Sequence, residues 1–201
     1  MNYLAHIHLA HLTDTSMLGN FFGDFVKGSD LSHLNDEHQL GVMLHRKIDS
    51  FTDTHVQVKA LRNLFPKSIR RMSGVVIDIY FDHLLCAHWE RFSEPALDKL
   101  LGNFYTEIHD YSNYISDRFT QVRHGLLTYR WLTDYQYSKN CERSFLQIEK
   151  RLTNRVIFAH EAMQFIQQNE SELQARFLEF YPELIEFSHA KAVELRSLNE
   201  R

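Results

Sequence analysis

The chain is poor in the residues that make turns and cross-links. Its 201 residues include seven glycines, three prolines and two cysteines. So few turn-forming residues favour long helices over many short strands. The two cysteines, Cys86 and Cys141, cannot build a disulfide framework and lack zinc-ribbon spacing, which suits a reducing compartment. We therefore predict a cytoplasmic protein.

Other absences remove whole classes of function. The first residues lack the basic and apolar regions of a signal peptide, and no apolar run approaches the roughly 20 residues that span a bilayer. A net charge of −4 with a pI near 6.3 argues against general nucleic-acid binding. There is no glycine-rich phosphate loop and no Gly-x-Ser-x-Gly elbow, so serine-type catalysis is the weaker enzymatic interpretation.

Apolar residues make up 44% of the chain and recur at helical spacing, which predicts one all-α domain over residues 1–201. Strict alternation in the first segment would also fit a strand. The expected helices cover residues 3–12, 16–28, 35–51, 56–65, 67–92, 95–114, 117–135, 138–152, 154–169 and 170–198, the last with Pro182 at a kink.

Histidine is unusually abundant, with 13 residues, six of them before residue 50. His45, Asp49 and Asp53 follow one another at i, i+4 spacing, so on a helix their side chains share one face. This face is either a site or an ordinary solvated surface. His6 belongs to the first helix and is either a site group or a satisfied core histidine.

Three further carboxylates lie in apolar surroundings. Asp24 sits among phenylalanines and therefore needs a partner such as a metal, a histidine or Lys27. Asp78 and Asp82 stand at i, i+4 in a nearly all-apolar segment, where two carboxylates repel each other without a cation or a proton. His83 adds an imidazole beside this pair.

A mixed set of histidine and aspartate side chains from several helices suits a hard or borderline divalent cation such as Mn²⁺ or Mg²⁺. Such a cation activates water for phosphoester hydrolysis, and a nearby imidazole or carboxylate moves the proton. Arg46 or Lys27 would neutralise phosphate oxygens. A helical protein-binding module, with these carboxylates as mere surface charge, is the non-enzymatic alternative.

Four motifs in order carry a family resemblance. They are Asn2-x-Leu4-Ala5-His6-x-x-Leu9-Ala10, Gly19-Asn20-x-x-x-Asp24-Phe25-Val26-Lys27-Gly28, His45-Arg46-x-Ile48-Asp49-x-x-Thr52-Asp53 and Asp82-His83-x-Leu85-x-x-His88-Trp89. The chain resembles bacterial acyl-carrier-protein phosphodiesterases, a family described as all-helical and related to HD-type metal-dependent phosphohydrolases. The resemblance implies an HD-like helical bundle that hydrolyses 4′-phosphopantetheine from holo-acyl carrier protein, with Mn²⁺ preferred. The alternative enzyme is an HD-like hydrolase of a nucleotide or other small phosphoester.

Carried onto this chain, the resemblance implies the ligands Asp24, His45, Asp49 and Asp82. It implies supporting or proton-transfer roles for His6, His83, Asp53 and Asp78, with Arg46 as a phosphate contact and Lys27 as a binding group. The parent superfamily has a His-Asp dyad, whereas this chain has Asp82-His83 in the reverse order.

The implied partner is an acidic protein, although this chain is itself net acidic. Binding therefore needs a local basic patch, and one is expected around Pro66. Its members are Arg62, Lys67, Arg70 and Arg71.

Overall fold

The computed structural model describes residues 2–153 and 155–199, and these ranges contain helices and no strand. The α-helices are α1 (Tyr3–Leu12), α2 (Met17–Phe22), α3 (Asp36–Thr54), α4 (Val56–Leu64), α5 (Ser73–Ala87), α6 (Trp89–Phe92), α7 (Leu97–Asp110), α8 (Asp117–Tyr129), α9 (Lys139–Arg151), α10 (Ala159–Gln168) and α11 (Glu170–Asn199). The described ranges also contain two short 3₁₀ helices, η1 (Arg70–Met72) and η2 (Thr133–Gln136). The predicted all-α class is confirmed.

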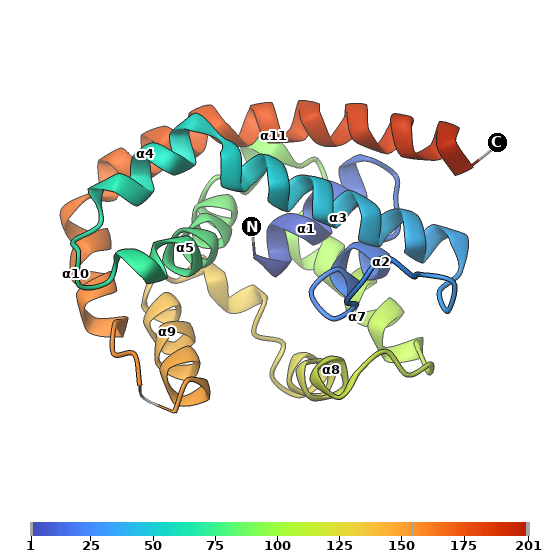
Figure 1. Cartoon of the computed structure of the whole chain (residues 1–201), viewed down its shortest axis with the longest axis horizontal. Helices are drawn as coiled ribbons and strands as arrows, with labels where there is room; N and C mark the ends of the chain where they lie inside the picture. The colour runs from blue at the N-terminus through green and yellow to red at the C-terminus, as the bar shows by residue number, and fades with distance from the viewer. Residues whose placement is uncertain (1, 154, 200–201) are drawn as a thin grey trace.

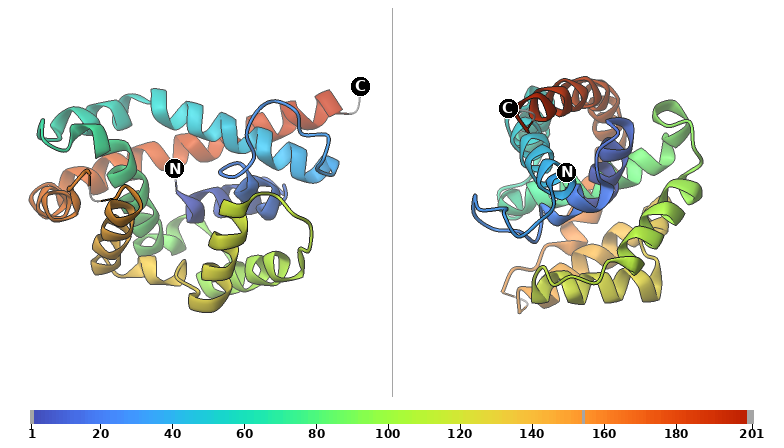
Figure 2. Two further views of the ribbon diagram at one scale, coloured as in Figure 1. Left: turned by 60° about the horizontal axis from the view of Figure 1, so that its bottom comes forward. Right: turned by 90° about the vertical axis from the view of Figure 1, so that its right-hand side faces the viewer.

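The longest helix, α11, runs beside α3 and α4, which follow each other along one edge of the molecule (Figures 1 and 2). α1 and α2 lie beneath α3, and α5 to α9 form the rest of the body (Figure 1). The apolar stripe of α11 is fully buried at Phe177, Phe180, Tyr181 and Leu184. Burial of such large side chains is the main driving force for this arrangement. Within the described part of the chain, no helix has the length and apolar character that a bilayer crossing requires.

The first helix is a helix and not a strand, and its N-terminus is held by a carboxylate from elsewhere in the chain. The backbone N–H groups of Leu4 and Ala5 donate to the two oxygens of the Asp82 side chain, at 2.9 and 3.0 Å. These N–H groups have no partner within the helix itself. A buried carboxylate at this position also complements the positive end of the helix dipole.

The second helix begins as predicted and ends earlier. Ser16 caps α2 by accepting the N–H of Gly19 at 2.9 Å. The predicted helix over 16–28 ends at Phe22, because α2 crosses α3 there with almost no space between the two backbones. A Cβ atom at Gly41 would lie 2.5 Å from the carbonyl carbon of Gly19, so this crossing needs both glycines.

The predicted 67–92 helix is divided into η1, α5 and α6, with a break at His88. The predicted 117–135 helix is also divided, because α8 ends at Tyr129, Arg130 takes a left-handed conformation (φ 48°) and η2 begins at Thr133. The remaining predicted helices differ from the observed ones mainly at their ends, where local patterns specify the least. The break between α3 and α4 falls where the sequence indicates it. There, the His55 side chain accepts the N–H of Gln57 at 3.3 Å and so caps α4.

Candidate metal centre

The close crossing of α2 and α3 brings three metal-ligating side chains together beside α1. His6 of α1 faces His45 and Asp49 of α3, and their ligand atoms all lie within 4.8 Å of one another. Nε2 of His6 is 3.1 Å from Oδ1 of Asp49, and Nε2 of His45 is 3.1 Å from Oδ2. The His6 and His45 side chains are 1% and 5% exposed, whereas Asp49 is 43% exposed. The group is therefore buried on one side and open to ligands on the other.

The hydrogen bonds of His6 define its tautomer. Nδ1 of His6 lies 2.9 Å from Oδ1 of Asn20, an oxygen that can only accept. Nδ1 therefore carries a proton, and Nε2 is the ring nitrogen that faces Asp49. Burial, helped by the nearby His45, lowers the pKa of His6, while the Asp49 carboxylate opposes this shift.

Asp49 stays ionised beside these rings. Burial acts to raise the pKa of Asp49, but the charge interaction with His6 and the hydrogen bonds from both histidines outweigh burial. They hold the pKa of Asp49 far below its usual range. With no cation bound, His6 Nε2 and Asp49 Oδ1 are hydrogen-bond partners at 3.1 Å.

A divalent cation can replace the proton between two such ligand atoms. Two ligand atoms at about 2.1 Å from one ion and at about a right angle to each other are about 3 Å apart, which matches the observed spacing. Two imidazole nitrogens and a carboxylate also form a donor set that divalent transition metals accept. The residues present therefore fit a divalent cation.

Gly23 sets the position of the His45 ring. A Cβ atom at residue 23 would lie 2.1 Å from Cγ and 2.3 Å from Cδ2 of His45. The backbone after α2 therefore packs directly on this imidazole. No larger residue fits there without moving the ring. The Gly19–Gly41 crossing and Gly23 together fix α2 against α3, and α2 in turn places Asn20 against His6.

The turn after α2 carries other residues that the sequence singles out. Asp24 is half-buried there, and Lys27 is exposed. Neither joins the group of three within 4.8 Å, which among the described residues contains only His6, His45 and Asp49. Arg46 lies beside the same turn, because its Nη2 donates to the carbonyl oxygen of Val26 at 3.3 Å.

The remaining predicted site residues lie elsewhere. Asp82 is fully buried and has both oxygens bonded to the N-terminus of α1, and burial raises its pKa to about 7. His83 donates from Nδ1 to the carbonyl oxygen of Tyr135 at 2.7 Å. Asp53 is exposed and pairs with Arg62 at 2.6 Å, while Asp78 lies half-buried on α5. A ligand role for Asp24 or Asp82 stays a prediction.

Sequence reasoning gave no site role to Asn20 or Gly23. Both lie in the Gly19–Gly28 motif, and their roles depend on contacts between helices that no local spacing displays. The available signal for a site role was an amide side chain and a glycine, one helical turn apart, next to Asp24.

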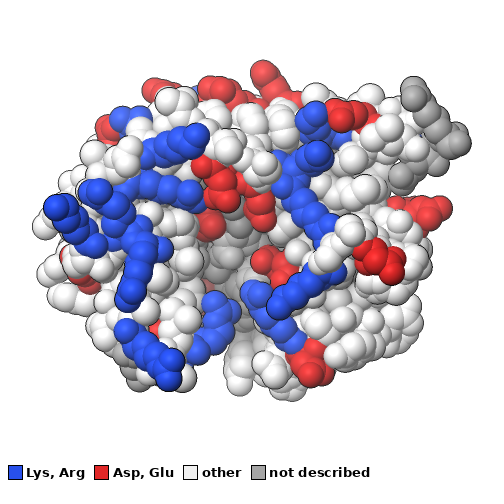
Figure 3. Space-filling model, in the orientation of Figure 1, with Lys and Arg blue, Asp and Glu red and all other residues white. Residues whose placement is uncertain are grey.

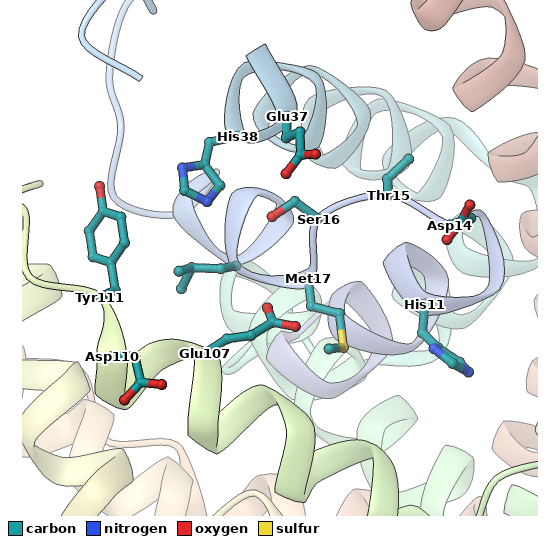
Figure 4. A pocket seen from close by; sticks show the side chains of 11 residues that line it. His11, Asp14, Thr15, Ser16, Met17, Glu37, His38, Glu107, Asp110 and Tyr111 are labelled. Atoms are coloured by element: carbon teal, nitrogen blue, oxygen red, sulfur yellow. The ribbon is translucent and has the colours of Figure 1, made fainter. Parts of the chain in front are cut away.

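An open cavity of about 540 Å³ lies at the other end of α3 (Figure 4). It is lined by the carboxylates of Asp14, Glu37, Glu107 and Asp110, and its described lining includes no lysine or arginine. None of the three clustered residues reaches it. The cavity is therefore separate from the candidate centre. The negative charge of its lining also makes it unsuitable for a phosphate ester.

The chain is therefore an all-helical protein with two histidines and one carboxylate, from two helices, that could hold a divalent cation. The sequence model of the family described as acyl carrier protein phosphodiesterase matches residues 1–184. The acyl carrier protein phosphodiesterase of Pectobacterium atrosepticum is 32% identical over 193 residues, covering 94% of this chain and 97% of the relative. That of Yersinia pestis is 33% identical over 198 residues, covering 96% and 100%. No solved structure matches this chain. The chain belongs to the acyl carrier protein phosphodiesterase family.

Proposed function

We propose that this chain is a metal-dependent phosphodiesterase that releases 4′-phosphopantetheine from holo-acyl carrier protein and leaves the apo-protein. Membership of the family supports the substrate class. The observation that carries the metal dependence is the convergence of ligand atoms from His6, His45 and Asp49 within 4.8 Å of one another. We further propose Mn²⁺ as the preferred ion and the cytoplasm as the location.

The residues have distinct roles in this proposal. His6, His45 and Asp49 hold the cation, which when bound polarises a phosphoryl oxygen and lowers the pKa of a water molecule. Asn20 holds the Nδ1 proton of His6, so that Nε2 faces the ion. Asp24 is the predicted ligand that lies nearest along the chain to the Gly23–His45 contact, and it is the candidate for completing the donor set.

One face of the molecule carries a charge pattern that suits an acidic protein substrate. Lysine and arginine side chains gather on both sides of a hollow, and aspartate and glutamate side chains lie between them (Figure 3). Because opposite charges steer association, an acidic carrier protein would be drawn to the basic sides.

The structure divides the predicted basic patch around Pro66 into two kinds of residue. Arg62 pairs with Asp53, and Arg70 donates to the carbonyl oxygens of Phe65 and Asn63 at the end of α4. Lys67 and Arg71 are exposed and form no side-chain hydrogen bond or ion pair with another described residue. We therefore propose Lys67 and Arg71 as the carrier-protein contacts and Arg70 as a cap of α4.

The decisive experiment is the mass of holo-acyl carrier protein after incubation with this protein and Mn²⁺. Loss of the phosphopantetheine mass, with apo-protein as product, supports the proposal. An unchanged carrier with hydrolysis of nucleotides would instead indicate a small-phosphoester hydrolase. An unchanged carrier, no other turnover and no metal binding would indicate a non-catalytic helical module.

The two exposed cations are tested with the double charge reversal Lys67→Glu/Arg71→Glu. We expect it to raise KM for holo-acyl carrier protein while leaving hydrolysis of bis(p-nitrophenyl) phosphate unchanged. An equal loss on both substrates would contradict a role in carrier-protein binding.

A further inference from the structure

Arg118 is an arginine of α8 that reaches the turn after α2. Its Nη1 donates to the carbonyl oxygen of Asp24 at 3.3 Å, and its guanidinium carbon lies 5.3 Å above the ring of Phe25. Burial and the Asp24 carboxylate raise the pKa of the Tyr3 hydroxyl on α1, and the nearby Arg118 guanidinium acts in the opposite direction. Three elements therefore meet at one exposed cation.

The backbone that carries Arg118 is itself fixed. Ser116 caps α8 by accepting the N–H of Phe119 at 3.2 Å. Phe119 is buried and packs against Phe21, Phe22 and Phe25. The guanidinium therefore starts from a rigid first turn, and its ordering costs little when a ligand binds.

Two contacts place this cation next to the candidate metal centre. Asp24 directly follows Gly23, whose Cα packs on the ring of His45. Tyr3 precedes His6 by one helical turn on α1, so their side chains share a face. Arg118 therefore contacts the neighbours of two of the three clustered residues.

Arg118 forms no ion pair within the described part of the protein, although the Asp24 carboxylate is close enough to act on the same Tyr3 hydroxyl. Its recorded partners are a carbonyl oxygen, a phenol and an aromatic ring, and no described carboxylate lies within ion-pair distance. By contrast, Arg62 and Arg176 are paired with Asp53 and Glu172. A rigid, unpaired guanidinium with several free N–H donors matches a phosphate group, which it binds through two parallel hydrogen bonds.

We propose that Arg118 binds the non-bridging phosphoryl oxygens of the substrate at the His6–His45–Asp49 centre, and that Tyr3 is the positioning residue for its guanidinium. The proposal rests on the proposed function, since it names a further phosphate contact at the same site. Arg118 then supplies the positive charge opposite the developing negative charge of the phosphoryl group. Arg46, held at the neighbouring carbonyl of Val26, would lie beside it.

The test measures phosphate binding as well as turnover. Inorganic phosphate is titrated calorimetrically into Mn²⁺-loaded protein, and hydrolysis of bis(p-nitrophenyl) phosphate is followed in parallel. We expect Arg118→Ala to weaken phosphate binding roughly 10- to 100-fold, because a hydrogen bond to a charged group is lost. Mn²⁺ affinity and melting temperature should stay unchanged. Arg118→Lys should give an intermediate loss, and Tyr3→Phe a loss of about threefold, because each keeps part of the arrangement.

Two controls separate phosphate binding from general charge and folding effects. Arg143→Ala removes an exposed arginine of α9 and should change neither phosphate binding nor turnover. Added methylguanidine should restore part of the activity of Arg118→Ala, which a merely structural role would not allow. Unchanged phosphate binding in Arg118→Ala, or an equal loss in Arg143→Ala, would overturn the proposal.

The outcomes also separate this inference from the proposed function. If the carrier protein is unchanged but phosphate binding still depends on Arg118, the inference holds for another phosphoester. If phosphopantetheine is released and phosphate binding does not depend on Arg118, the inference alone is wrong.

Discussion

The imidazole rings of His6 and His45 lie stacked, with centroids 3.9 Å apart and planes inclined by 21°. They come from two helices, and both direct Nε2 at the carboxylate of Asp49. One face of this pair is closed by Gly23, which packs on His45, and Asn20 bonds to His6 behind it. This closed side and the exposed carboxylate give the site one direction of access.

Gly23→Ala tests the packing behind His45. The added methyl would overlap the ring, with Cγ at 2.1 Å, so the ring must move. We expect a loss of about 1–3 kcal/mol in the free energy of unfolding and weaker Mn²⁺ binding. Gly102→Ala on α7 is the matched control, since a Cβ there meets nothing within 4 Å. Urea unfolding and calorimetry measure both quantities, and equal behaviour of the two variants would refute this role of Gly23.

Asn20→Ala tests the tautomer of His6. Without the Oδ1 acceptor at 2.9 Å, nothing holds the proton on Nδ1. We expect Mn²⁺ affinity to fall about 10- to 100-fold, as is usual when a partner of a ligating histidine is removed. Isothermal titration measures it, and an affinity equal to that of the unmodified chain would show that Asn20 does not orient His6.

Asp82→Asn separates a helix cap from a metal ligand. The amide keeps one acceptor for α1 but directs its NH₂ group at the other backbone N–H. We expect a loss of about 1–3 kcal/mol in the free energy of unfolding with Mn²⁺ affinity unchanged. Denaturant unfolding and metal titration on the same samples decide this. Loss of Mn²⁺ binding with stability retained would restore Asp82 to the ligand set.

These cases show what the sequence can and cannot predict. The i, i+4 spacing of His45 and Asp49 within one helix correctly predicts that their side chains meet. The pairing of His6 with them depends on how α1 packs against α3, which no local pattern contains. Similarly, the apolar surroundings of Asp82 correctly signal that it needs partners. Whether those partners are a cation or backbone N–H groups depends on the position of a helix 77 residues away along the chain.

The ends of the helices show the same contrast between local sequence and tertiary packing. Ser16 and Asn35 cap α2 and α3, and both belong to the residue types that favour this position. The early end of α2 results from its crossing with α3 and from the ring of His45, so it required the tertiary structure. The HD-like relationship stays a prediction.

His8 makes stability depend on pH. Burial lowers the pKa of His8 to about 4, whereas an unfolded histidine titrates near 6.5. Between these values the unfolded state holds one more proton, so the free energy of unfolding falls as pH falls from about 6.5 to 4. This group contributes at most ~3 kcal/mol over that range. His6, whose pKa burial also lowers, acts in the same direction.

His8→Gln should therefore flatten the decline without removing it. The measurement is urea unfolding of metal-free protein at a series of pH values between 7 and 4. The exposed His109 provides the control His109→Gln, which should keep the original slope. The explanation fails if His8→Gln and the unmodified chain show the same pH dependence.

The proposed function requires above all a cation bound by His6, His45 and Asp49. Calorimetric titration of Mn²⁺ into the metal-free chain and into His6→Ala and Asp49→Ala tests it most directly, with His11→Ala as a control on the same helix as His6. We predict that both site variants lose at least about 100-fold in affinity, retain their helical circular dichroism spectrum and lose turnover, while His11→Ala binds normally. Unchanged Mn²⁺ affinity in His6→Ala and Asp49→Ala would contradict the assignment of this centre.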